Sequence, residues 1–290
     1  MGEQQAVLVA LGTFELLSGS IEKDINVQIP IYQIDAFASG PFKGNPAAVC
    51  PLENWLSDDV LQAIAMENNL SETAFFVAES DGYYLRWFTP AVEVDLCGHA
   101  TLATGHVILN QLSPDLDRVA FETKSGTLVV RKLGDGLAMD FPSLPPGQSE
   151  HPAPALLSAL GAVPSEFRAI REVHGASYAM AVFETEAQVA ALSPQFASLG
   201  ANIIATAPGD NIDFVSRFFA PMSGINEDPV TGSAHCTLAP YWAERLGKTE
   251  LVARQISARG GDVGCRVDGD RVVLTGSCVA FMSGHINIPA

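Results

Sequence analysis

The chain has 290 residues, which is enough for two domains that each bury a core. Hydrophobic residues make up 48% of it and charged residues 17%, a composition typical of a globular protein rather than a disordered one. With 33 acidic and 16 basic residues, the formal charge is −17, so neither nucleic acid nor an anionic membrane is expected as a partner. The five scattered cysteines form no C-x-x-C pair, which favours reduced thiols and a cytoplasmic location.

Residues 1–28 form an N-terminal extension with no counterpart later in the chain. Residues 31–37 predict a strand, and the Gly-Asn-Pro sequence at 44–46 predicts a tight turn. The amide of Asn45 in this turn either holds the backbone or orients a ligand, and the sequence does not separate the two. A helix is expected to open at Ser57 as N-cap and to end at residues 68–69 in the left-handed conformation.

Glu72 lies at the start of an apolar, strand-forming run at residues 70–77. A partly buried carboxyl group is a suitable general acid or base, because burial moves its pKa toward the working pH. The alternative is that Glu72 caps a loop or pairs with an arginine.

A strand at residues 83–89 is followed by an apolar helix at about 98–112. His99 lies at the start of this helix, where the helix dipole and desolvation are expected to lower its pKa and leave a neutral imidazole. Residues 121–141 predict a hairpin.

The proline-rich residues 142–148 mark a boundary, so the predicted halves are residues 29–145 and 146–290. The last strand is a candidate to return to the first half. Two helices are expected in the second half, one at 151–160 and one that has Ser233 as its N-cap and that Pro240 kinks or breaks. Strands are expected at 178–183, 203–206, 213–219, 255–258, 264–267, 271–274 and 278–282.

The two halves repeat one pattern. Gly98 is echoed by Gly232 and Gly126 by Gly261, offsets of 232 − 98 = 134 and 261 − 126 = 135. A constant offset across a helix start and a hairpin indicates a duplicated unit of ordinary domain size. Either both copies contribute a helix N-terminus to one site, or only the scaffold is repeated.

Two carboxylates, Glu227 and Asp228, precede the second of these helix starts, where Gly232 and Ser233 follow. The N-terminus of a helix favours an anion, and glycine allows close approach of a ligand. The combination indicates a catalytic site for a small anionic molecule. No nucleotide-binding motif or metal-ligand spacing is present, so no cofactor and no metal are expected.

Several motifs in this order carry a family resemblance: Asp35-Ala36-Phe37, Gly44-Asn45-Pro46, Leu70-Ser71-Glu72-Thr73-Ala74-Phe75, Arg86-Trp87-Phe88-Thr89-Pro90, Cys97-Gly98-His99-Ala100-Thr101 and Glu227-Asp228-Pro229-Val230-Thr231-Gly232-Ser233-Ala234. The chain resembles the PhzF family of phenazine biosynthesis-like isomerases, within the diaminopimelate epimerase-like superfamily. The resemblance implies an α+β fold of two similar halves, each a curved, mostly antiparallel sheet wrapped around a central helix. It also implies a homodimer.

The resemblance further implies a cofactor-independent isomerase that moves a proton between carbons of a small carboxylated substrate, in a cleft between the halves. Glu72 is the implied acid/base, and His99 and Asp228 assist it. The implied substrate-binding residues are Asn45, Ser71, Gly98, Gly232 and Ser233.

Two alternatives remain open. Related epimerases and racemases use two thiols; Cys97 occupies the first of these places, whereas Pro229 and Val230 leave the second without sulfur. The second alternative is a non-catalytic protein that binds a metabolite.

Overall fold

The computed structural model describes residues 27–80, 82–173 and 176–288. Of the predicted N-terminal extension, residues 1–26 lie outside the described residues, and residues 27 and 28 begin the first strand. Among the described residues, no helix is both long and apolar enough to span a bilayer.

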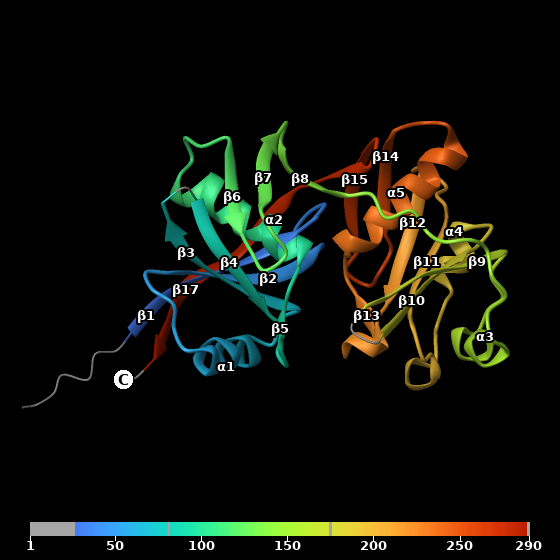
Figure 1. Ribbon diagram of the computed structural model, residues 1–290, viewed down its shortest axis with the longest axis horizontal. Helices are drawn as coiled ribbons and strands as arrows, with labels where there is room; N and C mark the ends of the chain where they lie inside the picture. Colours follow the sequence, from blue (N-terminus) through green and yellow to red (C-terminus); the bar gives the residue numbers. More distant parts are fainter. Residues whose placement is uncertain (1–26, 81, 174–175, 289–290) are drawn as a thin grey trace, which may run out of the picture.

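The molecule has two lobes side by side, each built from strands that curve around one helix (Figure 1). The elements of the first lobe are β1 (Val27–Ala36), β2 (Asn45–Leu52), α1 (Asp58–Asn68), β3 (Glu72–Glu79), β4 (Gly82–Phe88), β5 (Glu93–Val94), α2 (Gly98–Val107), the π-helical turn η1 (Ile108–Leu112), β6 (Arg118–Glu122), β7 (Leu128–Leu133) and β8 (Gly136–Pro142).

The second lobe repeats this order with additions between its strands. Its elements are α3 (Pro154–Leu160), β9 (Glu166–Val173), β10 (Ala176–Val182), α4 (Glu186–Ala190), η2 (Phe196–Ser198), β11 (Asn202–Pro208), β12 (Phe214–Phe219), η3 (Pro221–Ser223), β13 (Glu227–Asp228), α5 (Gly232–Leu246), β14 (Glu250–Gln255), β15 (Gly261–Asp268), β16 (Arg271–Gly276) and β17 (Cys278–Ile288).

Strand pairing shows that the lobes are copies of one unit. In the first lobe the order is β1–β2–β3–β4–β6–β7–β8, and in the second β9–β10–β11–β12–β14–β15–β16. Each copy has parallel pairs at its second and fourth steps, β2–β3 and β4–β6 or β10–β11 and β12–β14, and antiparallel pairs elsewhere. The predicted α+β fold is confirmed, and with it the duplication.

Two strand pairings join the sheets of the lobes. β8 pairs antiparallel with β16, and β17 leaves the second lobe and pairs along β1 of the first (Figure 1). The linker after β8 crosses in the opposite direction and makes a bridge from Ser149 to Arg168 in β9. The limits of the two predicted domains stay a prediction, because sheet hydrogen bonds run continuously across them.

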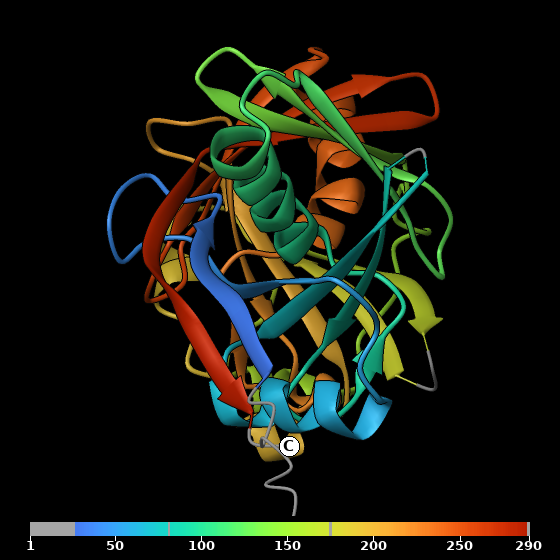
Figure 2. The ribbon, with the colours of Figure 1, turned by 90° about the vertical axis from the view of Figure 1, so that its left-hand side faces the viewer.

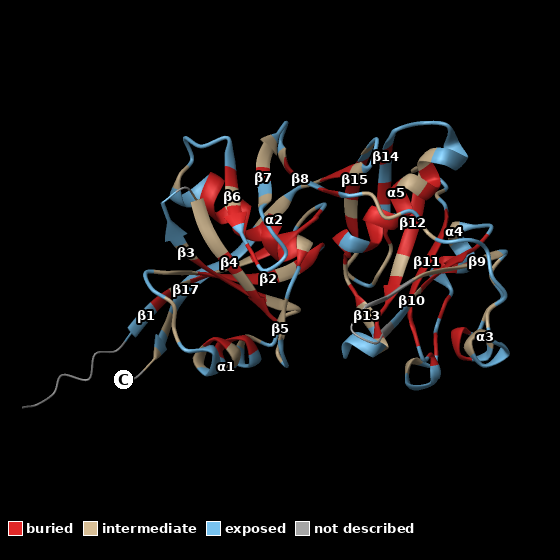
Figure 3. Ribbon diagram, in the orientation of Figure 1, coloured by how far each residue is buried: buried red, intermediate tan, exposed pale blue. Residues whose placement is uncertain are grey.

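The two central helices lie among the strands of their lobes (Figure 2), and much of each is buried (Figure 3). In α2 every residue from His99 to Gly105 is buried, and α5 has a buried face that includes Leu238 and Trp242. Residues of both helices belong to one hydrophobic cluster with the inner faces of the sheets. Separate clusters under α1 in the first lobe and under α3 in the second cover the outer faces.

Some predicted element limits were wrong. Pro240 does not break α5, which runs continuously from Gly232 to Leu246. Because proline has no N–H, the carbonyl oxygen of Cys236 one turn earlier loses its intrahelical donor. The backbone N–H of Leu144, in the linker between the lobes, donates to this carbonyl at 2.9 Å.

Other predicted limits also differ from those of the structure. The strand expected at 255–258 is instead β14, which ends at Gln255, and the helix expected at 151–160 begins at Pro154. β9 and the start of β10 were not predicted. The first helix does end as expected, at Asn69 with φ 49° and ψ 37°.

Candidate active site

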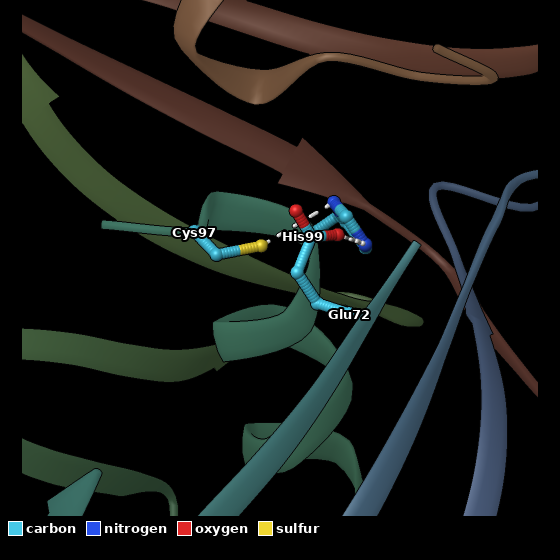
Figure 4. A group of neighbouring side chains, drawn as sticks. All are labelled: Glu72, Cys97 and His99. Carbon is cyan, nitrogen blue, oxygen red and sulfur yellow. Dashed lines mark hydrogen bonds and ion pairs between the residues drawn. The ribbon is translucent and has the colours of Figure 1, made fainter. Parts of the chain in front are cut away.

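Glu72 and His99 meet at the centre of the candidate site (Figure 4). Glu72 is the first residue of β3, and His99 is the second residue of α2. The Glu72 Oε2 and His99 Nε2 atoms are 3.0 Å apart, with 18% and 6% of the two side chains exposed. Neither of these two buried atoms has another hydrogen-bond partner among the described residues. The contact therefore joins a carboxylate and an imidazole with little access to water.

Asn45 connects this pair to the second lobe. Its Nδ2 donates to Asp228 Oδ1 at 2.8 Å and to the Val230 carbonyl at 2.9 Å, and it lies 3.2 Å from His99 Nδ1. Its Oδ1 accepts from the Ser71 hydroxyl at 3.0 Å. Asn45 is fully buried, and its side chain spans the junction of the lobes. All of these contacts are with protein groups, and the role of Asn45 in orienting a ligand stays a prediction.

Asp228 is the carboxylate that the second lobe supplies. It is the last residue of β13, 8% exposed, and its Oδ2 accepts from the Thr231 hydroxyl. Burial raises the pKa of Asp228 to about 6, against the opposing effect of a positive charge on His99. The negative charge on Glu72 raises it further. This carboxyl group is therefore poised to change its protonation near neutral pH.

Gln255 is a site residue that the sequence analysis missed. It is fully buried at the end of β14. Its Nε2 donates to the Asp228 carbonyl at 2.8 Å, and its Oε1 accepts from the Thr231 N–H at 2.9 Å. It thus holds the turn between Asp228 and α5 in shape. A glutamine more than 20 residues downstream, in a strand, gives no local signal of this role.

The expected low pKa of His99 was wrong. Burial does oppose a charged imidazole, but the neighbouring Cys97 sulfur and Glu72 carboxylate outweigh it and raise the pKa of His99 well above its usual value. Burial and the charge on Glu72 raise the pKa of the Cys97 thiol as well. Glu72 comes from a strand about 30 residues away in sequence, so its contact with the imidazole became visible only in the fold.

The two central helices begin side by side. A Cβ atom added at Gly98 would lie 3.9 Å from the Cα of Gly232. The first backbone N–H groups of a helix have no intrahelical acceptor, and the helix dipole makes this end positive. Two such ends therefore converge at the junction of the lobes, where they favour a small anion.

Ser233 does not cap α5, contrary to the prediction. The N-cap is Thr231, and Ser233 is the exposed second residue of the helix. The equivalent residue of the first lobe is His99, since Gly98 and Gly232 both open their helices. The N-cap equivalent to Thr231 is Cys97.

Glu227 does not join the site. It pairs with Arg217 through two hydrogen bonds of 2.7 and 2.9 Å. The first lobe has the same arrangement, in which Arg86 donates to Glu93 at 2.8 and 3.0 Å. The repeat therefore identifies this pair as part of the scaffold.

Glu72, Cys97 and His99 offer potential metal ligands within 4.8 Å of one another. Cys97 Sγ lies 3.5 Å from Nδ1 of His99, whereas Glu72 Oε2 lies 3.0 Å from Nε2. The sulfur and the carboxylate thus contact different nitrogens of the imidazole ring. A zinc ion needs all its ligand atoms directed at one point, so this arrangement suits proton handling better.

Comparison with known proteins identifies the family. The model of the phenazine biosynthesis-like protein family matches residues 34–284. The chain belongs to the phenazine biosynthesis-like family. A Pseudomonas aeruginosa member named as an uncharacterised isomerase is 51% identical over 266 residues, which cover 90% of this chain and all of the relative. The human phenazine biosynthesis-like domain-containing protein is 38% identical over 289 residues, covering 90% of this chain and 99% of that protein.

Solved structures of the phenazine biosynthesis-like family share the fold. The PhzF family protein of Enterococcus faecalis has a TM-score of 0.85 and 45% identity, and covers 90% of this chain and all of its own. A hydroxyproline epimerase from Agrobacterium vitis has a TM-score of 0.58 at 9% identity, over 91% of this chain and 93% of its own. The second likeness is one of fold alone.

Proposed function

We propose that the protein is a cofactor-independent isomerase that moves a proton between two carbons of a small carboxylated substrate. The observation that supports this most is the Glu72 carboxylate beside His99 Nε2, where two helix N-termini converge. The names of the relatives agree with an isomerase, since the Pseudomonas and Halalkalibacterium halodurans proteins are both called uncharacterised isomerases.

In this proposal the substrate carboxylate binds to the backbone amides of Gly98 and Gly232 and to the exposed Ser233 hydroxyl. The amides are fixed in advance by their helices, so they stabilise negative charge without reorganising during the reaction. No large basic side chain is needed, because the helix ends supply the positive potential.

Glu72 is the proposed acid/base. Its Oε2 lies 3.0 Å from His99 Nε2. Because Oε2 is engaged by His99, we assign to Oε1 the step of taking a proton from one carbon and returning it to another. Asp228 and His99 adjust the charge around it, while Asn45 and Ser71 hold the two lobes in register at the site.

Substitution of Glu72 tests the proposal. Glu72→Gln keeps the shape of the side chain but removes the base, and we expect a loss of about 10²–10⁴-fold in exchange. The measurement is solvent-deuterium incorporation into a dihydro-hydroxyanthranilate, followed by NMR. Glu79→Gln, at the exposed end of the same strand, is the matched control. Exchange at the wild-type rate in Glu72→Gln would refute Glu72 as the base.

A two-base racemase is the second candidate, because the Cys97 sulfur lies within 3.5 Å of His99. The equivalent N-cap in the second lobe is Thr231, whose hydroxyl is engaged by Asp228. This arrangement supplies one thiol rather than two. Racemisation of an amino acid that is lost in Cys97→Ser would favour this candidate over the isomerase.

A further inference from the structure

The hydrogen bonds of Asn45 restrict where the protons of His99 can lie. Asn45 Nδ2 faces two oxygen acceptors, Asp228 Oδ1 and the Val230 carbonyl, at 2.8 and 2.9 Å. A rotated amide would direct its oxygen at these two acceptors, so the orientation of Asn45 is fixed. An amide nitrogen has two hydrogens, and both are used by these shorter contacts.

The imidazole therefore needs another partner for Nδ1. Asn45 Nδ2 lies 3.2 Å away but has no hydrogen left to donate to it. The remaining contact is Cys97 Sγ at 3.5 Å, from the residue that caps the same helix. Both side chains are buried, which keeps water from substituting for either.

One proton lies between Cys97 Sγ and His99 Nδ1, and either atom can carry it. If sulfur carries it, the thiol donates to Nδ1 of a neutral ring, whose other hydrogen is then on Nε2. If Nδ1 carries it, Nε2 must carry a hydrogen too, because a bare Nε2 would direct its lone pair at the Glu72 carboxylate; the ring is then an imidazolium that donates to the sulfur. In both cases Nε2–H points at the Glu72 oxygen 3.0 Å away.

We propose that Cys97 is a positioning residue: by occupying Nδ1 it holds His99 as an Nε2–H donor to Glu72 Oε2. Glu72 is then kept with Oε1 turned toward the substrate. This inference rests on the proposed function of Glu72, but it assigns the sulfur a role that differs from that of a racemase thiol. Cys97 acts through His99 and does not touch the substrate.

The proton positions can be measured without any substrate. Nitrogen-15 NMR of the histidine side chains shows which ring nitrogen carries hydrogen, and His99→Gln assigns the signals. In the wild-type protein we expect hydrogen on Nε2 of His99. A wild-type Nε2 without hydrogen would overturn the proposal, whether or not any variant folds.

Substitutions then test whether sulfur is the cause. In Cys97→Ala, Nδ1 loses its partner and the His99 signals should shift to a mixture of tautomers. In Cys97→Ser the hydroxyl can still share a proton with Nδ1, so the wild-type pattern should return. Cys265→Ala removes a buried thiol of β15 outside the site and should change nothing at His99. Unchanged His99 signals in Cys97→Ala would overturn the proposal.

Deuterium incorporation into the dihydro-hydroxyanthranilate probe separates positioning from direct catalysis. In Cys97→Ala the rate of deuterium incorporation should fall about tenfold, the effect of losing one hydrogen bond. In Cys97→Ser most of this rate should return. A loss as large as that of Glu72→Gln in both variants would show a catalytic thiol and would overturn the proposal. If Glu72→Gln stays active while the tautomer depends on Cys97, the proposed function fails and the positioning role stands.

Discussion

Asp228 is a buried carboxylate at the junction of the two lobes. Its protonation is linked to the stability of the fold. Its pKa is about 6 in the folded protein and 3.8 for an ordinary aspartate. The folded state therefore binds the proton more tightly than the unfolded state. By linkage, this group lowers the free energy of unfolding as the pH rises from about 4 to 6.

The corresponding prediction is a difference between two pH profiles. Relative to Asp228→Asn, the wild-type protein should lose on the order of 3 kcal/mol in its free energy of unfolding between pH 4 and pH 7. Urea denaturation at several pH values measures it. Asp140→Asn, where an exposed carboxylate pairs with Arg271, should differ from wild type by less than about 1 kcal/mol. Parallel profiles for the wild type and Asp228→Asn would contradict the prediction.

At the scale of elements, α2 packs so closely against β7 that the contact at Gly105 has no space for a side chain. A Cβ atom added at Gly105 would lie 2.5 Å from a methyl carbon of Val130. Real side-chain carbons do not approach this closely, so the helix or the strand has to move. Displacing α2 also displaces His99 at its N-terminus.

We therefore expect Gly105→Ala to be destabilising despite the better helix propensity of alanine. Overpacking of this kind costs about 1–3 kcal/mol, whereas propensity returns no more than about 1 kcal/mol. Gly40→Ala is the control, since a Cβ atom there meets nothing within 4 Å. Equal denaturation midpoints for the two variants would show that β7 can move to accommodate the added methyl group without a measurable cost in stability.

At the scale of the whole molecule, Arg259 ties the lobes together beside the site. It donates to Asp35 Oδ1 at 2.8 Å and to the Gly44 carbonyl at 2.8 Å, and so joins a second-lobe loop to β1 and to the turn before Asn45. Asp35 is almost fully buried, while about a third of Arg259 is exposed.

Arg259→Met should cost about 2–4 kcal/mol in the free energy of unfolding, because it leaves the Asp35 carboxylate buried without a partner. The partial exposure of Arg259 reduces the effect below that of a fully buried pair. The double variant Asp35→Asn with Arg259→Met should recover part of the loss. Additive losses in a double-mutant cycle would contradict a direct interaction between these two side chains.

The homodimer stays a prediction, and β17 is where we expect to find it. Among the described residues this long strand pairs only with β1, which leaves its other edge open. Phe281 and Met282 of β17 are exposed. The rings of Phe42 and Phe281 form a T-shaped pair with their centroids 6.1 Å apart. Sedimentation should give twice the chain mass of 30.7 kDa, and Phe281→Arg should give the monomer. A monomeric wild type at micromolar concentration would contradict this.

Much of the architecture followed from patterns that are local in the chain. Glycine-led helix starts, repeated at an offset of about 134 residues, predicted the duplicated fold, because each copy must form the same helix against the same sheet. The family motifs identified Glu72, His99 and Asp228 as candidates. Local chemistry also predicted that Asn69 ends α1 in the left-handed conformation.

Only the tertiary structure decided how these residues act on one another. The raised pKa of His99, the bonds of Asn45 to both lobes and the support of Thr231 by Gln255 all depend on contacts between residues far apart in sequence. Charge, burial and hydrogen bonding are set by distances in space, whereas the sequence alone reports neighbours along the chain. The sequence could therefore name candidate residues such as Glu72, His99 and Asp228, but not their protonation, their partners or the supporting residue Gln255.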